Sequence, residues 1–440
     1  LRGISNLKAQ LALYAEIDIA HLPYNKAVLE YVEEQHRVEK RQLVLCTGSH
    51  EMLAEQVCRH FDFFSGCLAT DNTTNLTGRM KAQRLVEEYG SHGFDYIGNE
   101  EKDHHVWLVS RHALVVSDDS KFVDEVKKRH NVSKIFDSGA RPFRSIPKQL
   151  RLHQWLKNVL VAVPLVLSLS SFTLDSLLRI VVAFVVFGLV ASGTYILNDL
   201  FDLDADRRHL TKRYRPLANG ALPIKNGLIL MSLCISLGVI LTLAYLPIAF
   251  SLVLLTYLAT TLAYSSRLKS VAMLDVCLLA GLYTLRVVAG TVAIGAPWSF
   301  WLLAFSMFIF MSLALAKRTS ELVNLLDQGK RDVSGRGYST DDVPIITSMG
   351  VSSGLLSVLV IALYINSEKV LLNYVFPELL WLCCPALLYW IGRVWLITSR
   401  GQMDEDPIIF AISDRVSWIL LAVTMSAAAI GYFLMSTFVV

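Results

Sequence analysis

The chain of 440 residues has few charged residues, and its cysteines show no spacing typical of disulfide frameworks. Only 18% of the residues are Asp, Glu, Lys or Arg, whereas 53% are hydrophobic. A water-soluble chain of this length rarely has such a composition. The seven cysteines are odd in number and lack a Cys-x-x-Cys pair, so we interpret them as reduced thiols and small apolar side chains. The chain has no signal peptide and begins with Leu1, which is consistent with a fragment.

Charged residues are scarce mainly after about residue 158. This change in composition divides the chain into regions. We predict a polar domain over residues 1–138, a basic linker without Asp or Glu over 139–157, and a membrane domain over 158–440. A basic segment before an apolar region suits an anionic membrane surface. The membrane domain contains apolar stretches long enough to cross a bilayer. About nine such stretches are expected, at 159–173, 177–197, 227–246, 248–264, 273–294, 298–316, 345–366, 378–397 and 408–439.

The loops between these stretches alternate in charge. Those at 198–225, 265–272, 317–344 and 398–407 contain most of the Lys and Arg residues of the membrane domain, whereas the intervening loops contain almost none. Because loops rich in Lys and Arg usually stay in the cytoplasm, we predict that this face is cytoplasmic. The N-terminal domain precedes the first stretch and is expected on the same side. We therefore expect an integral protein of the bacterial inner membrane.

The N-terminal domain shows an alternating pattern of strands and helices. Short apolar runs at 41–48, 96–97 and 113–116 predict strands, and residues 24–39 and 81–89 predict helices. Such alternation is typical of an α/β domain with a mostly parallel sheet. The expected fold class is therefore multi-domain, with a small soluble α/β domain followed by an all-α polytopic membrane bundle.

Several segments of this domain resemble motifs of the haloacid dehalogenase superfamily of phosphatases. They are Thr47-Gly48, Gly78-Arg79-Met80-Lys81 and Gly98-Asn99-Glu100-Glu101-Lys102-Asp103. The resemblance implies a phosphate held by Thr47 and Lys81, and magnesium held by an acidic pair. However, the Asp-x-Asp-x-Thr nucleophile motif is absent from the sequence, and Asn99 stands where the family has an acid. Without the nucleophile no phosphoaspartate can form, so we predict a degenerate or truncated regulatory domain.

A cluster of carboxylates follows the apolar stretch 177–197. Asp199, Asp202 and Asp206 are separated by three and four residues, a spacing that places them on one face of a continuous helix. Carboxylates gathered on one face repel each other and require a cation. Mg²⁺ prefers oxygen ligands and often bridges them to substrate phosphates. We therefore predict a magnesium site here, the alternative being a solvated acidic loop.

Basic and polar residues on the same predicted face could hold the negative charge of a diphosphate. Arg286 lies within an apolar stretch, where an arginine is costly and usually functional. Its structural alternative is a pairing with a buried carboxylate. Besides the aspartate cluster, the predicted catalytic residues are Lys269 and Asp275, and the predicted substrate-binding residues are Asn198, Lys157, Arg213, Arg215, Tyr264, Arg286, Lys317 and Arg318.

The pattern Asn198-Asp199-x-x-Asp202-x-x-x-Asp206 resembles the first aspartate-rich motif of the UbiA superfamily of intramembrane transferases. The later segment Arg215-Pro216-Leu217-Ala218-Asn219-Gly220 is similar to the Arg-Pro segment of that family. This resemblance covers the chain from about residue 150 onwards. It implies a helical bundle with a central cavity, in which the aspartates face a magnesium-bound diphosphate under a cytoplasmic cap.

Three further segments are similar to the polyprenyl-phosphate phosphoribosyltransferases of this superfamily. They are Gln154-Trp155-Leu156-Lys157-Asn158, Tyr264-x-x-x-Leu268-Lys269 with Asp275, and Arg400-Gly401-Gln402-Met403-Asp404-x-Asp406-Pro407. Leu152 departs from that branch, which usually has proline there. Asp275 is the single carboxylate of the second motif, whereas aromatic-acceptor prenyltransferases have two or more.

The resemblance implies a magnesium-dependent transferase that displaces diphosphate. The favoured substrates are phosphoribosyl diphosphate as donor and a polyprenyl phosphate as acceptor, within the bilayer and without nucleic acid. In the first alternative, a prenyl group moves from a prenyl diphosphate to an aromatic or other small acceptor. In the second, the chain is a non-catalytic membrane scaffold or transporter whose acidic cluster only binds a cation.

Overall fold

A computed structural model describes residues 3–14, 17–168, 172–327, 337–374, 376–403 and 406–438. The chain folds into two compact units, and both are discontinuous in sequence. The first combines Leu1–Gln149 with Asp199–Leu228, and the second combines Leu150–Asn198 with Ile229–Val440. The charged segment after residue 198 therefore belongs to the same unit as the polar N-terminal region.

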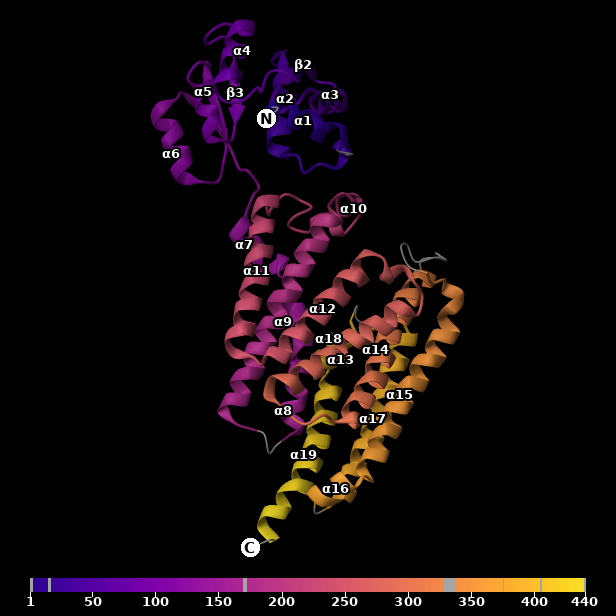
Figure 1. The fold of residues 1–440 in the computed structure, drawn as a ribbon. Helices are drawn as coiled ribbons and strands as arrows, with labels where there is room; N and C mark the ends of the chain where they lie inside the picture. The colour runs from indigo at the N-terminus through magenta and orange to yellow at the C-terminus, as the bar shows by residue number, and fades with distance from the viewer. Residues whose placement is uncertain are drawn as a thin grey trace. The chain divides into compact units, whose positions relative to one another are not determined.

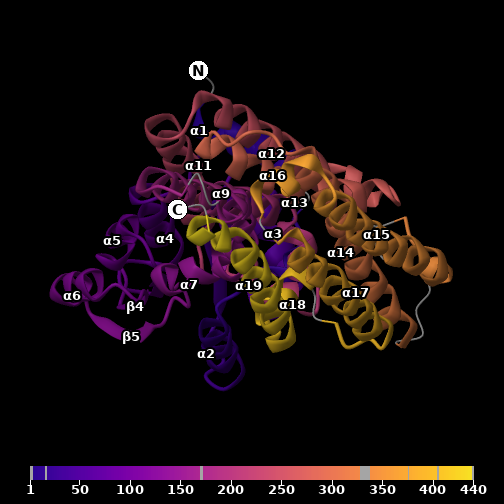
Figure 2. The ribbon, with the colours of Figure 1, turned by 90° about the horizontal axis from the view of Figure 1, so that it is seen from below.

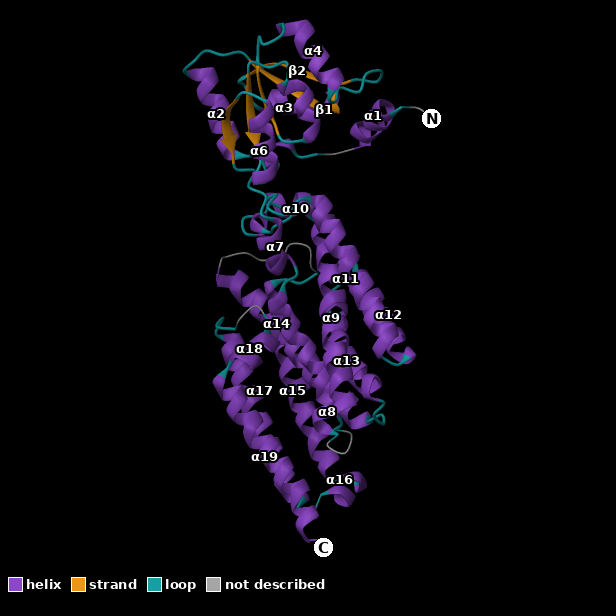
Figure 3. Cartoon of the chain, turned by 90° about the vertical axis from the view of Figure 1, so that its left-hand side faces the viewer, coloured by secondary structure: helices purple, strands orange, loops and turns teal. Residues whose placement is uncertain are grey.

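The N-terminal part of the first unit is an α/β domain, as predicted. β1 (Leu43–His50) pairs with β2 (Phe64–Thr70), and β3 (Asp95–Gly98), β4 (His112–Val116) and β5 (Val132–Phe136) form a second sheet. All these pairings are parallel, and Figure 3 shows the strands in orange. The helices are α1 (Ile4–Tyr14), α2 (Lys26–Arg37), α3 (Glu51–His60), α4 (Arg79–Tyr89), α5 (His104–Trp107), α6 (Ser120–Arg129) and α7 (Pro142–Gln149).

An ionic cluster at the start of β3 stabilises the second sheet. Asp95 accepts hydrogen bonds from Arg111, the residue before β4, at 3.0 and 2.9 Å, and its carboxylate lies 2.7 Å from Arg41 and 2.9 Å from His112, the first residue of β4. Burial raises the pKa of Asp95, but the hydrogen bonds from Arg111, Arg41 and His112 outweigh burial and hold that pKa well below its usual value. The charged carboxylate therefore fastens β3 to β4.

The segment Asp199–Leu228 of the first unit contains the short helix α10 (Leu203–Arg208) and a 3₁₀ turn, η5 (Lys212–Tyr214). Contacts with the N-terminal region hold this segment. Arg208 Nε donates to Asp18 Oδ2 at 2.6 Å, and the Arg141 main-chain N–H donates to the Ala221 carbonyl oxygen at 2.9 Å. These contacts explain why the charged segment and the α/β domain form one unit.

The second unit is a bundle of long apolar helices (Figure 1). Some of these helices extend into the sequence of the first unit at one end. They are α9 (Leu174–Phe201), α11 (Ile224–Tyr245), α12 (Ile248–Ser266), α13 (Leu274–Ile294), α14 (Phe300–Asp327), α15 (Val343–Ile365), α17 (Cys383–Ser399) and α19 (Arg415–Phe438). Shorter elements are η3 (Leu152–Ala162), α8 (Val163–Leu167), α16 (Glu368–Asn373), the 3₁₀ segments η6 (Leu268–Ser270) and η8 (Pro377–Leu382), and α18 (Pro407–Ser413).

Among the described residues, seven helices are long and apolar enough to cross a membrane, or eight if one bent pair counts as a span. The prediction of a polytopic helical bundle is confirmed, but the count of nine is wrong at both ends. The stretch predicted at 159–173 falls mainly in a short apolar helix, Leu152–Leu167. The stretch predicted at 408–439 is bent by 75° between Pro407–Ser413 and Arg415–Gly431, where Asp414 binds Arg393 instead of continuing the helix.

Close contacts at glycines set the packing of the bundle. In Figure 2, α14 and α15 lie side by side, and α15 also packs against α17. A Cβ atom on Gly350 of α15 would lie 2.1 Å from the ring of Trp395 on α17, and one on Gly290 of α13 would lie 2.0 Å from the carbonyl oxygen of Val161 on η3. Small residues at such points allow apolar helices to approach closely within a bilayer. They also fix η3 against α13.

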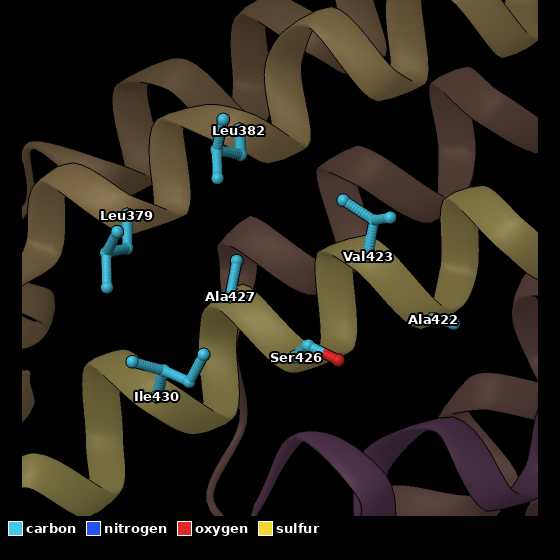
Figure 4. Close-up of a pocket in the computed structure, with 7 residues that line it drawn as sticks. All are labelled: Leu379, Leu382, Ala422, Val423, Ser426, Ala427 and Ile430. Atoms are coloured by element: carbon cyan, nitrogen blue, oxygen red, sulfur yellow. The ribbon is translucent and has the colours of Figure 1, made fainter.

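An apolar groove of about 400 Å³ lies between η8 and α19. Figure 4 shows leucines of η8 facing small and branched side chains of α19. Its lining contains no charged residue and consists of Leu379, Leu382, Ala422, Val423, Ser426, Ala427 and Ile430. A groove of this composition offers nothing that could hold a phosphate, so the charged chemistry takes place elsewhere.

Candidate active site

The predicted aspartate cluster does not lie on one continuous helix. α9 ends at Phe201, and Asp202 has φ −90° and ψ 11° before α10 begins. The expectation that Asp199, Asp202 and Asp206 share one helical face is therefore wrong. Asp199 and Asp206 are each only 3% exposed, whereas Asp202 and Asp204 are exposed. Two of the four carboxylates in this run are therefore buried, one on each side of the helix break, and the other two are exposed to solvent.

The two buried carboxylates converge on Arg215, a residue of the predicted Arg-Pro segment. Its Nη1 atom donates to Asp199 Oδ1 at 3.0 Å and to Asp206 Oδ2 at 2.6 Å. Gln149, the last residue of α7, donates from Nε2 to Asp199 Oδ2 at 2.9 Å. Burial raises the pKa of Asp206, although the neighbouring guanidinium of Arg215 opposes this effect. The two buried carboxylates of the first unit therefore share one cation, the guanidinium group of Arg215.

This arrangement is chemically suited to a divalent cation. Two buried carboxylates that meet at one positive group form an all-oxygen set of the kind that Mg²⁺ prefers. Among the described residues, however, no group of three or more His, Cys, Asp and Glu side chains has a metal-binding arrangement. Asp202, the predicted third ligand, lies outside the pair joined by Arg215.

Two other predicted residues, Asn198 and Arg213, lie close to these elements in sequence, whereas Lys269 follows α12. Asn198 of α9 donates to the Ser265 hydroxyl of α12 at 2.8 Å, which joins the ends of two helices. Arg213 stacks on the ring of Tyr214 and is exposed, so it is available to solvent-borne anions. Lys269 is half-buried on η6.

The second unit contains a buried cluster of charges around Asp406. Its Oδ2 atom lies 2.5 Å from Lys157 Nζ on η3 and 3.5 Å from Lys317 Nζ on α14. The Tyr283 hydroxyl of α13 donates to the same carboxylate at 3.4 Å. These four residues are called the Lys157 cluster below. Asp404, the other acid of the predicted Asp404-x-Asp406 motif, lies outside the described residues.

Arg286 of α13 is held by neutral groups. Its Nε donates to Asn158 Oδ1 at 3.0 Å, Nη1 to the Leu282 carbonyl at 2.6 Å, and Nη2 to the Tyr257 hydroxyl at 3.2 Å. None of its contacts within the described part of the chain is a carboxylate, so the alternative of a structural ion pair is not realised there. The Asn158 Nδ2 atom is buried and has no hydrogen-bond partner among the same residues. A buried cation without a counter-ion and an unpaired donor both favour an anionic ligand.

Arg318 and Asp275 belong to a separate network of buried charged and polar side chains. The Arg318 guanidinium pairs with Asp275 and with Glu321, and the side chains of Arg318 and Asp275 are completely buried. The Tyr338 hydroxyl donates to Asp275 Oδ1 at 2.6 Å. Arg318 also interacts with Tyr264 of α12. The predicted catalytic acid and two predicted substrate-binding residues therefore bind one another, an arrangement typical of a structural clamp.

Residues 159–415, more than half of the chain, match the UbiA prenyltransferase family. The chain belongs to the UbiA prenyltransferase family. The resemblance seen in its aspartate motif is thus confirmed, and the protein is an integral membrane transferase. Its helices α9 to α18 lie within or across the matched region. The α/β domain precedes that region.

Several curated proteins are similar to this chain. Protein y4nM of Sinorhizobium fredii is 36% identical over 430 residues, which are 97% of this chain and 82% of that protein. Nodulation protein NoeC of Azorhizobium caulinodans is 33% identical over 285 residues, 64% of this chain and 91% of that protein. The decaprenyl-phosphate phosphoribosyltransferase of Mycolicibacterium smegmatis is 38% identical over 179 residues. That alignment covers 40% of this chain and 56% of the enzyme, so the chain matches little more than half of it.

Proposed function

We propose that this UbiA transferase moves 5-phosphoribose from phosphoribosyl diphosphate to a polyprenyl phosphate and releases diphosphate. The observation that carries the proposal is the presence of two separate groups of charged residues. One is the carboxylate pair Asp199 and Asp206, and the other combines the Lys157 cluster with Arg286. The second group has three cations and one carboxylate. A reaction between two phosphate-bearing substrates needs both groups, whereas an aromatic acid carries only a single carboxylate charge and does not need three cations.

The carboxylate pair is assigned to the donor. Asp199 and Asp206, with Asp202 as the proposed third ligand, would hold Mg²⁺, which neutralises the charge that grows on a departing diphosphate. Arg215 already binds both buried carboxylates and can donate hydrogen bonds to phosphate oxygens as well. The proposed catalytic role of Lys269 is a charge contact with the same diphosphate.

The Lys157 cluster, Arg286 and Asn158 are assigned to the acceptor phosphate. An oxygen of that phosphate attacks C1 of the ribose and forms a new C–O bond, while the C–O bond to diphosphate breaks and its electron pair leaves with the diphosphate. Because the lipid phosphate is anionic at neutral pH, this step needs no general base. Asp406 keeps Lys157 and Lys317 together, and the unpaired Asn158 amide can donate to the phosphate.

The similarity to decaprenyl-phosphate phosphoribosyltransferases supports this donor and acceptor but spans only 40% of this chain. The alternative, transfer of a prenyl group from a prenyl diphosphate to a small acceptor, is supported by the family to which the chain belongs. The third hypothesis, a non-catalytic scaffold or transporter, is not supported, because the chain belongs to a family of transferases. Lysine- and arginine-rich loops support a location in the bacterial inner membrane with the aspartates on the cytoplasmic face.

The α/β domain is proposed as a degenerate phosphatase-like module. Lys81 Nζ donates to the Tyr96 hydroxyl at 2.8 Å, and that hydroxyl donates to Asp103 Oδ1 at 3.0 Å. The other oxygen of Asp103 accepts from the main-chain N–H groups of Asn99 and Glu100, at 2.9 and 3.0 Å. Asp103 is therefore engaged in holding the turn after β3. Hydrolysis of a small phosphomonoester by the purified chain would contradict this interpretation.

The test of the main proposal offers the purified protein two substrate mixtures with magnesium. One contains labelled phosphoribosyl diphosphate and polyprenyl phosphate, and the other contains labelled geranylgeranyl diphosphate and an aromatic acid. We expect label to enter the lipid product only in the first mixture. Asp199→Asn and Asp202→Asn should abolish this transfer. The matched control is Asp204→Asn, because Asp204 belongs to the same acidic run but is exposed and pairs with Arg207 at 3.3 Å. Transfer only in the second mixture would refute the proposal.

A further inference from the structure

Gln149 is a buried polar residue beside the carboxylate pair that no motif assigns to the site. It ends α7, its side chain is only 1% exposed, and its Nε2 donates to Asp199 Oδ2 at 2.9 Å. The orientation of the amide follows from chemistry, because an ionised carboxylate can only accept hydrogen bonds. The amide nitrogen therefore faces Asp199, and the amide oxygen faces away from it.

The Oε1 atom of Gln149 is buried and has no hydrogen-bond partner among the described residues. A buried polar atom of this kind is uncommon and normally has a partner. Because Oε1 is an acceptor, the partner has to be a donor or a cation. That partner would lie near Asp199, because Oε1 belongs to the same amide group as the Nε2 atom that binds Asp199. Asp199 is the residue assigned to the donor diphosphate.

We propose that Gln149 determines donor specificity by accepting a hydrogen bond from a ribose hydroxyl. This inference rests on the proposed function, since it concerns the same site. Phosphoribosyl diphosphate has hydroxyl groups on C2 and C3, next to the C1 atom that bears the diphosphate. A prenyl diphosphate has only C–H groups at the corresponding distance from its diphosphate. The Oε1 acceptor beside Asp199 thus receives a hydrogen bond when the sugar is bound and receives none when an isoprenoid is bound. This difference disfavours binding of the isoprenoid.

The same amide also donates to Asp199, but Arg215 holds that carboxylate as well, so loss of this one hydrogen bond should affect the cation site little. The two roles predict different losses. Removal of the sugar contact weakens binding of phosphoribosyl diphosphate but not of inorganic diphosphate, which has no hydroxyl group on carbon. Loss of a cation ligand, or general damage to the site, would weaken binding of both molecules.

The experiment compares binding of phosphoribosyl diphosphate and of inorganic diphosphate to the full chain in detergent, each with magnesium, by calorimetric titration. Gln149→Met keeps the approximate size of the side chain and removes its donor and acceptor. We expect about 10- to 100-fold weaker binding of phosphoribosyl diphosphate and less than about 3-fold weaker binding of diphosphate. Ser145→Ala, a buried polar position on the same helix, should leave both affinities unchanged.

A second measurement uses the unaltered protein, so it does not depend on how the variant folds. Analogues of phosphoribosyl diphosphate that lack the 2-hydroxyl or the 3-hydroxyl compete with the labelled donor. At least one analogue should bind about 10-fold more weakly or worse, and Gln149→Met should bind that analogue and the natural donor equally.

The outcomes separate this inference from the proposed function. Equal weakening of diphosphate and phosphoribosyl diphosphate in Gln149→Met, or full affinity of the unaltered protein for both deoxy analogues, overturns the role of Gln149 alone. If the unaltered protein binds diphosphate but shows no added affinity for phosphoribosyl diphosphate and transfers no ribose, the proposed function fails, and the inference fails with it.

Discussion

The pairing of Lys157 with Asp406 predicts a large energetic coupling between the two residues. Both side chains are nearly buried, and their charged atoms lie 2.5 Å apart. Asp406 also lies 3.5 Å from Lys317 and accepts a hydrogen bond from the Ile408 main-chain N–H at 3.1 Å. Asp406→Asn keeps the shape of the side chain but leaves two buried ammonium groups without their counter-ion.

The magnitude follows from the cost of an unpaired buried charge. Removal of one partner of a buried ion pair typically destabilises a protein by about 3–5 kcal/mol. Asp406→Asn should therefore lower the free energy of unfolding by an amount in this range. In the double variant with Lys157→Met, one of the two stranded ammonium groups is also removed, so the double variant should be at least about 1–2 kcal/mol more stable than the sum of the single effects.

The assay is reversible unfolding of the detergent-solubilised protein, monitored by tryptophan fluorescence in all four members of the cycle. The control cycle uses Asp175 and Arg179, an exposed pair at 2.8 Å on α9, for which coupling of about 0.3–0.5 kcal/mol is expected. Polyprenyl phosphate should stabilise Asp406→Asn more than the unaltered protein, because its phosphate replaces the lost carboxylate charge. Additive effects of Asp406→Asn and Lys157→Met would refute the reasoning.

Three further predictions concern single residues. Asp275→Asn should lower the melting temperature, by the equivalent of about 1.5–3 kcal/mol, because the buried Arg318 loses one of its two carboxylate partners and keeps only Glu321; an unchanged thermal unfolding curve would contradict a clamp. Arg286→Lys should reduce transfer about 10- to 100-fold in a radiolabel assay, since an ammonium group cannot make the three directed bonds of the guanidinium; full activity would remove Arg286 from the site. Asp95→Asn should weaken hydrogen-exchange protection of β4 by about 1–2 kcal/mol at neutral pH. Because the folded pKa of Asp95 is lowered, this difference should persist down to about pH 4 and disappear as the pH falls further; a difference that grows on acidification would contradict the assigned pairing.

The sequence was most informative where a pattern repeats over many residues. Apolar stretches of about 20 residues predicted most of the long helices, and alternating strands and helices predicted the parallel α/β domain. Local breaks were not predictable, because periodicity is the same on both sides of them. The aspartate spacing fits a helix, yet the chain leaves the helical conformation at Asp202. β2 and β5 were missed because their apolar residues are interrupted by serine, glycine or lysine.

The remaining differences between the prediction and the structure come from contacts between residues that are distant in sequence. Asp275 and Arg318 were predicted separately as site residues, but their buried pairing depends on packing between α13 and α14 and could not be predicted. Gln149 escaped notice because a glutamine in a basic linker has no distinctive sequence signal. Its meaning comes from its bond to Asp199 and from its unpaired oxygen.

The 3₁₀ form of η3 has a consequence for the register between η3 and α13. Two contacts join these elements: Asn158 binds Arg286, and the Val161 carbonyl lies against Gly290. From the first contact to the second, η3 advances three residues and α13 advances four. Three residues of a 3₁₀ helix rise about 6 Å at about 2.0 Å each, and four residues of an α-helix rise the same distance at about 1.5 Å each.

The two contacts therefore have the same spacing along both helices only because η3 is a 3₁₀ helix and α13 is an α-helix. If η3 were an α-helix, its three residues would rise about 4.5 Å, and the Asn158 amide would miss the guanidinium of Arg286 by about 1.5 Å. A methyl group at Gly290 would likewise push η3 along α13. Gly290→Ala should thus impair the proposed acceptor-phosphate site, although the atoms nearest to a Cβ at Gly290 belong to the Val161 main chain and to Pro164.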